Sequence, residues 1–148
     1  MNMQYGTNEN ESSQIDESMK KNAGCAPGRT RVLIVDDMQL IRKKIHDMLA
    51  EENFDVVGEA DDGDMAVKMA AELTPDLIIM DIEMNRMNGI EATAQIKQSN
   101  PHVKIIIVTN TARPSIVIES LKAGAANFIT KPFDNHHVHL VIRKALSE

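Results

Sequence analysis

The sequence predicts an α/β fold in which a doubly wound, five-stranded parallel sheet is covered by five helices. Five short strand-like runs alternate with five longer segments in which apolar residues recur every three or four positions. Four of the short runs are mostly apolar, as expected for strands that are buried on both faces of a parallel sheet. Right-handed crossovers between such strands place helices on both sides of the sheet.

The first two strand–helix units lie between residues 31 and 75. A strand over residues 31–36 precedes a helix whose apolar face consists of Ile41, Ile45, Met48 and Leu49. A second strand covers residues 55–59, and the turn Asp61-Asp62-Gly63 leads into a second helix. That helix ends at Thr74-Pro75, because the residue before a proline disfavours helical backbone. Its inward face consists of Ala66, Ala70 and Leu73.

The third unit begins with a strand over residues 77–80. The helix that follows starts at Asn88-Gly89 and ends near Asn100-Pro101. A fourth strand then covers residues 103–108, and its apolar residues again indicate burial on both faces.

The last two helices carry clear terminal signals. Pro114 fits the first turn of the fourth helix, and Gly124 is suited to end it in a left-handed conformation. After a fifth strand over residues 127–130, Asp134 is expected to cap the fifth helix. The apolar face of that helix consists of Val138, Val141, Ile142 and Ala145.

Composition places the chain among soluble globular proteins. It has 148 residues, of which 43% are hydrophobic and 26% charged, and this fits one domain with enough core to fold alone. A net charge of −6 disfavours a nucleic-acid binder, since that class is usually basic. The sequence contains neither a membrane-length apolar run nor the apolar core of a signal peptide. With Cys25 as the single cysteine, no intrachain disulfide is possible, and we expect a cytoplasmic location.

Residues 1–28 differ in composition from the rest and are interpreted as a disordered N-terminal tail. Asn, Glu, Ser, Asp, Gln and Lys dominate this segment, and its few apolar residues show no sustained period. A tether or docking segment is one interpretation, and a solvated extension without a specific role is the preferred one. The folded domain is expected to occupy residues 29–148.

Side chains suited to one small acidic site follow four of the strand-like runs, namely Asp36-Asp37, Asp81, Thr109 and Lys131. In open α/β sheets ligands bind at the carboxyl ends of the strands, so these side chains are expected to meet. Carboxylates this close raise one another's pKa unless a cation intervenes. Oxygen ligands favour a hard ion such as Mg²⁺, which is commonly held by one or two carboxylates and phosphate oxygens. The pattern therefore predicts a site for a divalent cation and a phosphoryl group.

A carboxylate in such a site can attack phosphorus and form an acyl phosphate. Asp81 is the best candidate for this nucleophile, because it stands alone at the end of the central strand. The metal ion and Lys131 would neutralise the oxygens on which charge sits during transfer, and the hydroxyl of Thr109 would donate to another of those oxygens.

Several motifs together carry a family resemblance: Val35-Asp36-Asp37, Asp81 with residues 84–89, Thr109, Ala123-Gly124-Ala125, Phe128, and Lys131-Pro132-Phe133. Over residues 31–146 the chain resembles the receiver domains of two-component response regulators, and particularly the single-domain chemotaxis regulators of the CheY-like family. The resemblance implies a flavodoxin-like sheet with the strand order 2-1-3-4-5. It also implies that the protein is not an enzyme with turnover, but undergoes self-phosphotransfer and autodephosphorylation only.

The resemblance assigns the metal and phosphate chemistry to individual residues. Asp81 is expected to be the phosphoacceptor and to ligate Mg²⁺ directly, together with Asp37 and the backbone carbonyl of Glu83. Asp36 is expected to act on the metal mostly through water, and Mn²⁺ is an alternative ion. Lys131 is expected to contact the acceptor carboxylate or its phosphate.

The resemblance also implies a conformational switch. Thr109 is expected to shift toward the phosphoryl group, and Phe128 to turn inward into the space vacated. This movement would remodel the surface formed by the fourth helix, the fifth strand and the fifth helix. The Lys131–Pro132 peptide bond is expected to be cis.

The chain departs from the family pattern at two positions. Asn85 stands where proline is usual, which predicts a less rigid loop. Asn110 stands where a very small residue is usual and where access to the phosphoryl group is controlled, so it is expected to slow donor entry or hydrolysis, or to hydrogen-bond the phosphate. Together with Glu83 and Thr111, Asn110 is expected to tune the kinetics of the phosphorylated state.

His136, His137 and His139 cluster at the start of the fifth helix. Because no acidic or cysteine partner completes an obvious ligand set, a metal-binding or pH-sensing role is disfavoured. A solvated or partner-facing helix end is the preferred interpretation.

The leading hypothesis for function is a stand-alone phosphorylation switch. A histidine kinase would phosphorylate Asp81, and the altered surface would bind a downstream protein effector. In a chemotaxis pathway this effector would be a flagellar motor switch protein. We expect a monomer, with a dimer as the alternative, and neither nucleic-acid binding nor membrane insertion. The other hypotheses are a phosphorelay shuttle or phosphate sink, a phosphorylation-independent scaffold, and a small phosphohydrolase.

Overall fold

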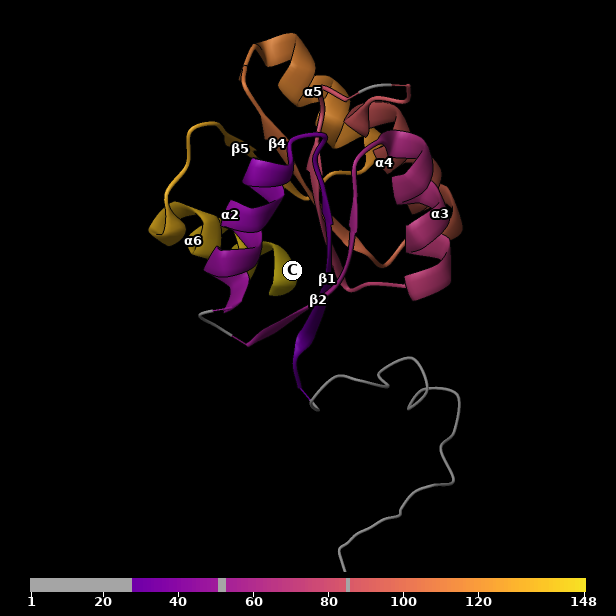
Figure 1. Ribbon diagram of the computed structural model, residues 1–148. Helices are drawn as coiled ribbons and strands as arrows, with labels where there is room; N and C mark the ends of the chain where they lie inside the picture. The colour runs from indigo at the N-terminus through magenta and orange to yellow at the C-terminus, as the bar shows by residue number, and fades with distance from the viewer. Residues whose placement is uncertain (1–27, 51–52, 85) are drawn as a thin grey trace, which may run out of the picture.

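The structure, a computed structural model, describes residues 28–50, 53–84 and 86–148 (Figure 1). The strands are β1 Thr30–Val35, β2 Phe54–Ala60, β3 Leu77–Asp81, β4 Lys104–Thr109 and β5 Asn127–Thr130. The helices are α2 Gln39–Ala50, α3 Gly63–Leu73, α4 Gly89–Ser99, α5 Pro114–Ala123 and α6 Asn135–Leu146. Cys25 and Asn85 lie outside the described residues, as does the predicted tail apart from Gly28.

All five strands belong to one parallel sheet with the order β2-β1-β3-β4-β5. Five helices alternate with these strands within the described ranges. The predicted fold class and strand order are therefore confirmed, and each strand end lies within one residue of its predicted position. Among the described residues, every helix is too short or too polar to cross a membrane.

Short-range interactions set the helix ends where the sequence predicted them. The side-chain oxygen of Asn88 accepts from the backbone N–H groups of Ile90 and Glu91, both at 2.9 Å, and so caps α4. Asp134 caps α6 in the same way, through a 2.8 Å bond from the N–H of His137. Gly124 ends α5 with a φ of 114°, a left-handed conformation that glycine adopts without steric cost.

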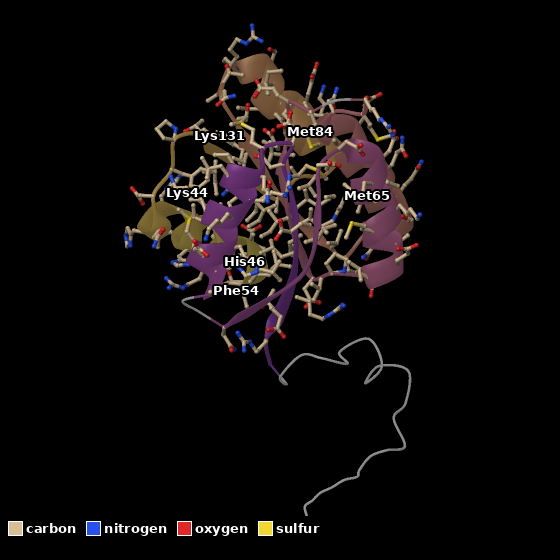
Figure 2. All side chains as sticks on the ribbon, viewed as in Figure 1. Lys44, His46, Phe54, Met65, Met84 and Lys131 are labelled. Atoms are coloured by element: carbon tan, nitrogen blue, oxygen red, sulfur yellow. The ribbon has the colours of Figure 1, made fainter. Side chains whose placement is uncertain are left out.

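Successive side chains of a strand point to opposite faces of the sheet, and this creates two apolar cores, one on each face. Val32 and Ile34 of β1 face α2 and α6, whereas Leu33 and Val35 face α3, α4 and α5. The two groups of helices lie on opposite sides of the sheet in Figure 1, and Figure 2 shows side chains filling both spaces. Burial of each large aliphatic side chain in these cores stabilises the fold by about 1.5–3 kcal/mol. The cores therefore hold the strand ends in a rigid frame.

His139 corrects one of our interpretations. We assigned the three histidines of α6 to a solvated or partner-facing helix end, but His139 is buried and its Nε2 atom lies 3.1 Å from the carbonyl oxygen of Met48 in α2. The interpretation was wrong for His139 because this residue lies one turn before Ile142, at the edge of the buried face. His136 and His137 are exposed, as expected.

Candidate functional site

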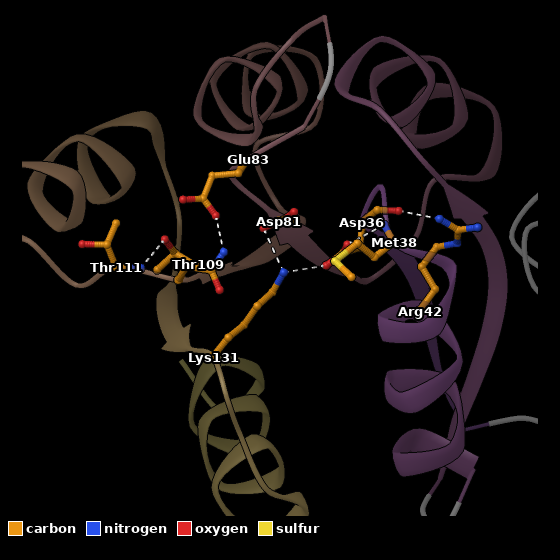
Figure 3. A network of polar contacts seen from close by, with 9 residues as sticks. Asp36, Met38, Arg42, Asp81, Glu83, Thr109, Thr111 and Lys131 are labelled. Atoms are coloured by element: carbon orange, nitrogen blue, oxygen red, sulfur yellow. Dashed lines mark hydrogen bonds and ion pairs between the residues drawn. The ribbon is translucent and has the colours of Figure 1, made fainter.

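The sheet register brings the predicted polar residues to one edge. Strand β1 pairs Val35 with Met80 of β3, so Asp36 and Asp81 follow neighbouring positions. Strand β3 in turn pairs Asp81 with Val108, the residue before Thr109 in β4. Lys131 comes directly after β5, and its side chain extends from there to the two aspartates (Figure 3).

Three carboxylates form the acidic part of the site. Asp36 and Asp81 are only 1% and 2% exposed, whereas Asp37 is exposed to solvent. One oxygen atom from each residue lies within 4.8 Å of the others. Such a set of oxygen donors fits a hard divalent cation such as Mg²⁺, which keeps part of its water shell. Within the part of the chain that the structure describes, these three aspartates are the cluster of acidic, histidine or cysteine side chains that could hold a metal ion.

Lys131 bridges the two buried carboxylates. Its Nζ atom lies 3.1 Å from Oδ2 of Asp36 and 3.4 Å from Oδ1 of Asp81. The other oxygen of Asp36 accepts a 2.8 Å bond from the backbone N–H of Met38. The resemblance pointed to Asp81 as the partner of Lys131 and missed Asp36, although both aspartates were placed at neighbouring strand ends. The lysine thus supplies positive charge to the whole acidic cluster.

Burial and the neighbouring charges together raise the pKa values of two groups in this cluster, Asp81 and Lys131. Desolvation, followed by the repulsion from Asp36, raises the pKa of Asp81 to about 6, although attraction and hydrogen bonding from Lys131 and a backbone hydrogen bond from Glu83 act against the rise. Burial by itself lowers the pKa of Lys131, but its attraction to Asp81 and Asp36 outweighs burial and leaves that pKa raised. Near pH 7 Asp81 is therefore mostly ionised and Lys131 is protonated.

Arg42 supports the site from α2 and was not identified from the sequence. Its guanidinium donates to the backbone carbonyl oxygen of Asp36 and to Oε1 of Glu59, the latter at 3.0 Å. The loop that carries Asp36 and Asp37 is thereby joined to both α2 and β2. The helical pattern gave no signal for this role, because it depends on how α2 crosses the end of the sheet.

The last residue of β4 and the residues that follow it form hydrogen bonds beside Asp81. Thr109 is 1% exposed, and its Oγ1 accepts from the backbone N–H of Thr111 at 3.1 Å. The side-chain amide of Asn110 donates to Oε1 of Glu83 at 2.8 Å. The sequence placed both Asn110 and Glu83 near the phosphoryl position, but it did not indicate that their side chains bind each other.

The remaining predicted site residues are Phe128 in β5 and the residues at the start of the loop between β5 and α6. Phe128 pairs with Ile107 of β4, is half-buried, and packs against the core on the α3, α4 and α5 side. The backbone N–H of Lys131 donates to the carbonyl oxygen of Thr109 at 2.8 Å. The peptide bond between Lys131 and Pro132 is cis. Strands β4 and β5 are therefore tied together at the edge that holds the site.

Comparisons with known proteins agree with this geometry. Residues 32–143 match the model of the response regulator receiver domain. The chain is 43% identical to the chemotaxis protein CheY of Bacillus subtilis over 79% of this chain and 98% of that protein, and 42% identical to CheY of Thermotoga maritima over 77% and 95%. It also resembles the solved CheX–CheY–BeF3–Mg²⁺ complex from Borrelia burgdorferi, with a TM-score of 0.79 and 27% identity over 85% of this chain and 98% of that one. The chain therefore belongs to the family of response regulator receiver domains.

Proposed function

We propose that this protein accepts a phosphoryl group from a histidine kinase on Asp81 and, once phosphorylated, binds a protein partner through the surface of α5, β5 and α6. One observation carries the proposal. Asp81 is a buried carboxylate at the end of β3, 3.4 Å from a lysine amine and within 4.8 Å of two further carboxylates. A buried acid in such surroundings is suited to phosphoryl transfer rather than to a structural role.

In the proposed reaction an oxygen atom of Asp81 attacks the phosphorus atom of a phosphohistidine on the kinase. The new bond joins phosphorus to the Asp81 oxygen, and the bond from phosphorus to the histidine nitrogen breaks, with its electron pair returning to the imidazole. A pKa of about 6 keeps Asp81 largely ionised at neutral pH and thus nucleophilic. Lys131 is placed to neutralise charge on the phosphoryl oxygens, which is the main contribution that a protein makes to such a transfer.

The carboxylates of Asp37 and Asp81 and the backbone carbonyl of Glu83 are proposed to hold Mg²⁺, and Asp36 to act on it mostly through water. Receiver domains bind Mg²⁺ at an acidic pocket, and the donor set of this chain fits Mn²⁺ as well. When bound, the ion supplies positive charge to the carboxylates and to the phosphoryl oxygens. Arg42 and Lys131 hold the loop that carries Asp36 in place and so position the carboxylate of Asp36.

Thr109 and Phe128 are proposed to couple phosphorylation to the partner-binding surface. They lie on adjacent strands, and Phe128 belongs to the core that α5 covers. A shift of the Thr109 hydroxyl toward the phosphoryl group would leave space at its original position, and Phe128 is placed to fill it. Exposed apolar side chains are available for a partner on both helices, at Ile118 and Leu121 of α5 and at Leu140 of α6.

The comparisons favour a chemotaxis pathway, because the relatives in Bacillus subtilis and Thermotoga maritima are chemotaxis proteins. We propose the chemotaxis histidine kinase as donor and a flagellar motor switch protein as the downstream partner. Affinity for that partner is expected to rise when Asp81 is phosphorylated and to fall with Ile118→Ser. The matched control is Leu40→Ser, which removes an exposed apolar side chain from α2 instead. Equal effects of the two variants would argue against the α5–β5–α6 surface.

The central test is intact-protein mass spectrometry after incubation with acetyl phosphate and Mg²⁺. We expect one added phosphoryl group on the wild type and on Asp47→Asn, a variant of an exposed acid, and none on Asp81→Asn. A histidine kinase panel serves as the second donor. The proposal would be overturned by a folded wild type that accepts phosphoryl from neither donor, or by an adduct that persists in Asp81→Asn.

A further inference from the structure

A groove lies at the opposite end of the sheet from the acidic site. Its volume is about 620 Å³. Its wall includes Asp76, directly before β3, and Lys104, the first residue of β4, together with residues at the carboxyl ends of α3 and α4. The apolar part of the wall is formed by Ala70, Ala71, Pro75, Ile96, Val103 and Leu146. We call this surface the base groove.

The N-terminal segment of the chain enters the fold beside the base groove. The backbone N–H of Arg31 donates to Oδ2 of Asp76 at 3.0 Å, and its guanidinium donates to the carbonyl oxygen of Thr74 at 2.9 Å. Both acceptors belong to residues of the groove wall. Three residues of chain, from Gly28 to Arg31, span at most about 11 Å. Residues 1–27, which lie outside the described residues, therefore join the domain close to the groove.

The sequence of this segment offers side chains that match an apolar groove. Ile15 and Met19 are four residues apart, so in a helical turn both lie on one face. The chain from Met19 to Gly28 can extend to about 30 Å, which is more than the distance from Gly28 to the groove requires. The segment around Ile15 and Met19 can thus reach the wall.

Charge also favours this segment as the occupant. Lys104 lies on the wall, Arg31 is hydrogen-bonded to the wall, and Lys97 donates from Nζ to the carbonyl oxygen of Val103 at 2.7 Å. These three cations outnumber Asp76, the acid on the wall. Residues 9–19, by contrast, contain four acidic residues and no basic one. The two surfaces therefore attract each other, by an amount that salt reduces.

We propose that residues 12–21 dock in the base groove of their own chain, with Ile15 and Met19 against its apolar wall and Asp16 and Glu17 toward Lys104. Burial of the two apolar side chains favours docking, and the short tether keeps the segment at a high local concentration. The docked segment stabilises the domain, because the groove exists only in the folded state. Composition alone favoured a solvated extension, whereas the groove supplies a surface on which the segment binds.

A nitroxide spin label placed within the segment tests the docking in the full chain. Cys25 is the single cysteine, so Ser18→Cys/Cys25→Ser moves the attachment point to a position beside Met19. We expect the label to broaden the backbone amide resonances of Ala71, Ser99 and His102 in a ¹H–¹⁵N NMR spectrum. The broadening is expected to be largely lost when Ile15→Ser/Met19→Ser is added to the labelled chain. The matched control is Met3→Ser/Tyr5→Ser, which removes two apolar side chains outside the segment and is expected to retain it.

A variant on the groove side probes the same contact from the domain. Ala71 is an exposed residue of α3 on the groove wall, so Ala71→Glu adds both bulk and a negative charge that repels Asp16 and Glu17. We expect this variant to lose most of the broadening at Ser99 and His102. Ala94→Glu makes the same change at an exposed position of α4 away from the groove wall and is expected to leave the broadening unchanged.

A mixed sample distinguishes the chain's own segment from that of a second copy. Spin-labelled protein without ¹⁵N is combined with ¹⁵N-labelled protein that carries no spin label, and we expect no broadening at the groove. Broadening in the mixed sample would assign the groove to a second copy and overturn docking within one chain. Groove resonances that the label leaves sharp, or that stay equally broadened with Ile15→Ser/Met19→Ser, would also overturn it. None of these measurements involves phosphorylation of Asp81, so the proposed function is unaffected by their outcome.

Discussion

Gly89 packs directly against the backbone of Asp81. A Cβ atom added to Gly89 would lie 2.1 Å from the carbonyl oxygen of Asp81, a distance at which the backbone itself must move. The N–H of Gly89 also donates to the carbonyl oxygen of Ile82 at 3.0 Å. The start of α4 therefore rests on the strand end that carries the proposed phosphoacceptor, and glycine is needed there for its small size.

Gly89→Ala is expected to destabilise the protein by about 1–3 kcal/mol, since overpacking against a backbone atom forces α4 away from β3. Because Asp81 lies at the point of contact, phosphorylation by acetyl phosphate is expected to slow as well. Urea denaturation and adduct formation measure the two effects. Gln95→Ala on the exposed side of the same helix is the control and is expected to change stability by less than about 0.5 kcal/mol. Wild-type values in Gly89→Ala would contradict the close approach.

Asp81 is expected to make stability depend on pH. Its pKa rises from 3.8 to about 6 on folding, so the folded protein binds this proton more tightly than the unfolded chain does. The free energy of unfolding therefore falls as pH rises through this interval, by about 3 kcal/mol in total. In metal-free buffer Asp81→Asn is expected to be more stable than the wild type at pH 8, by up to about 3 kcal/mol.

That gain is expected to shrink as the pH is lowered toward 4, where Asp81 becomes neutral in the wild type too. Chemical denaturation of both proteins between pH 4 and pH 8, with a chelator present, measures the difference. The exposed Asp47→Asn variant should show no comparable pH-dependent gain. A pH-independent difference between Asp81→Asn and the wild type would be inconsistent with a burial-raised pKa.

Mg²⁺ is expected to raise the melting temperature, because an ion that binds only the folded state stabilises it and relieves the repulsion among the three aspartates. At a hundred times its dissociation constant the gain is about 2.7 kcal/mol. Asp37→Asn is expected to weaken the shift, and Asp47→Asn to retain it. Differential scanning calorimetry over a magnesium titration tests this prediction. If saturating Mg²⁺ leaves the melting temperature of the wild type unchanged, the result would count against the metal site.

Lys131→Gln is expected to destabilise the metal-free protein at pH 8 by up to about 3 kcal/mol, because it removes the positive charge that Asp36 and Asp81 share. The loss should diminish at low pH, where Asp81 is protonated, and with Mg²⁺ bound. Lys43→Gln breaks an exposed pair with Asp47 and is the matched control, with an expected effect of less than about 1 kcal/mol. Equal losses in the two variants at pH 8 would show that the Lys131 bridge contributes little.

Local physical chemistry made the secondary structure predictable from the sequence. Short apolar runs, the proline at 114 and the caps at Asn88, Gly124 and Asp134 act over a few residues, so their effects can be read along the chain. Strand ends could be located in the same way, and this brought the acidic residues and Lys131 into one predicted site. The strand order followed from the family resemblance and not from these local signals.

Contacts between segments far apart in the chain were decided by the tertiary structure alone. His139 is a buried partner of Met48, and Arg42 joins Asp36 to Glu59. Lys131 bridges two aspartates, and Asn110 donates to Glu83. Each of these depends on the angle at which helices cross the sheet or on the course of a loop, and helical periodicity carries no information about either. The sequence by itself determined which side chains reach the edge of the sheet, whereas packing determined which of them touch there.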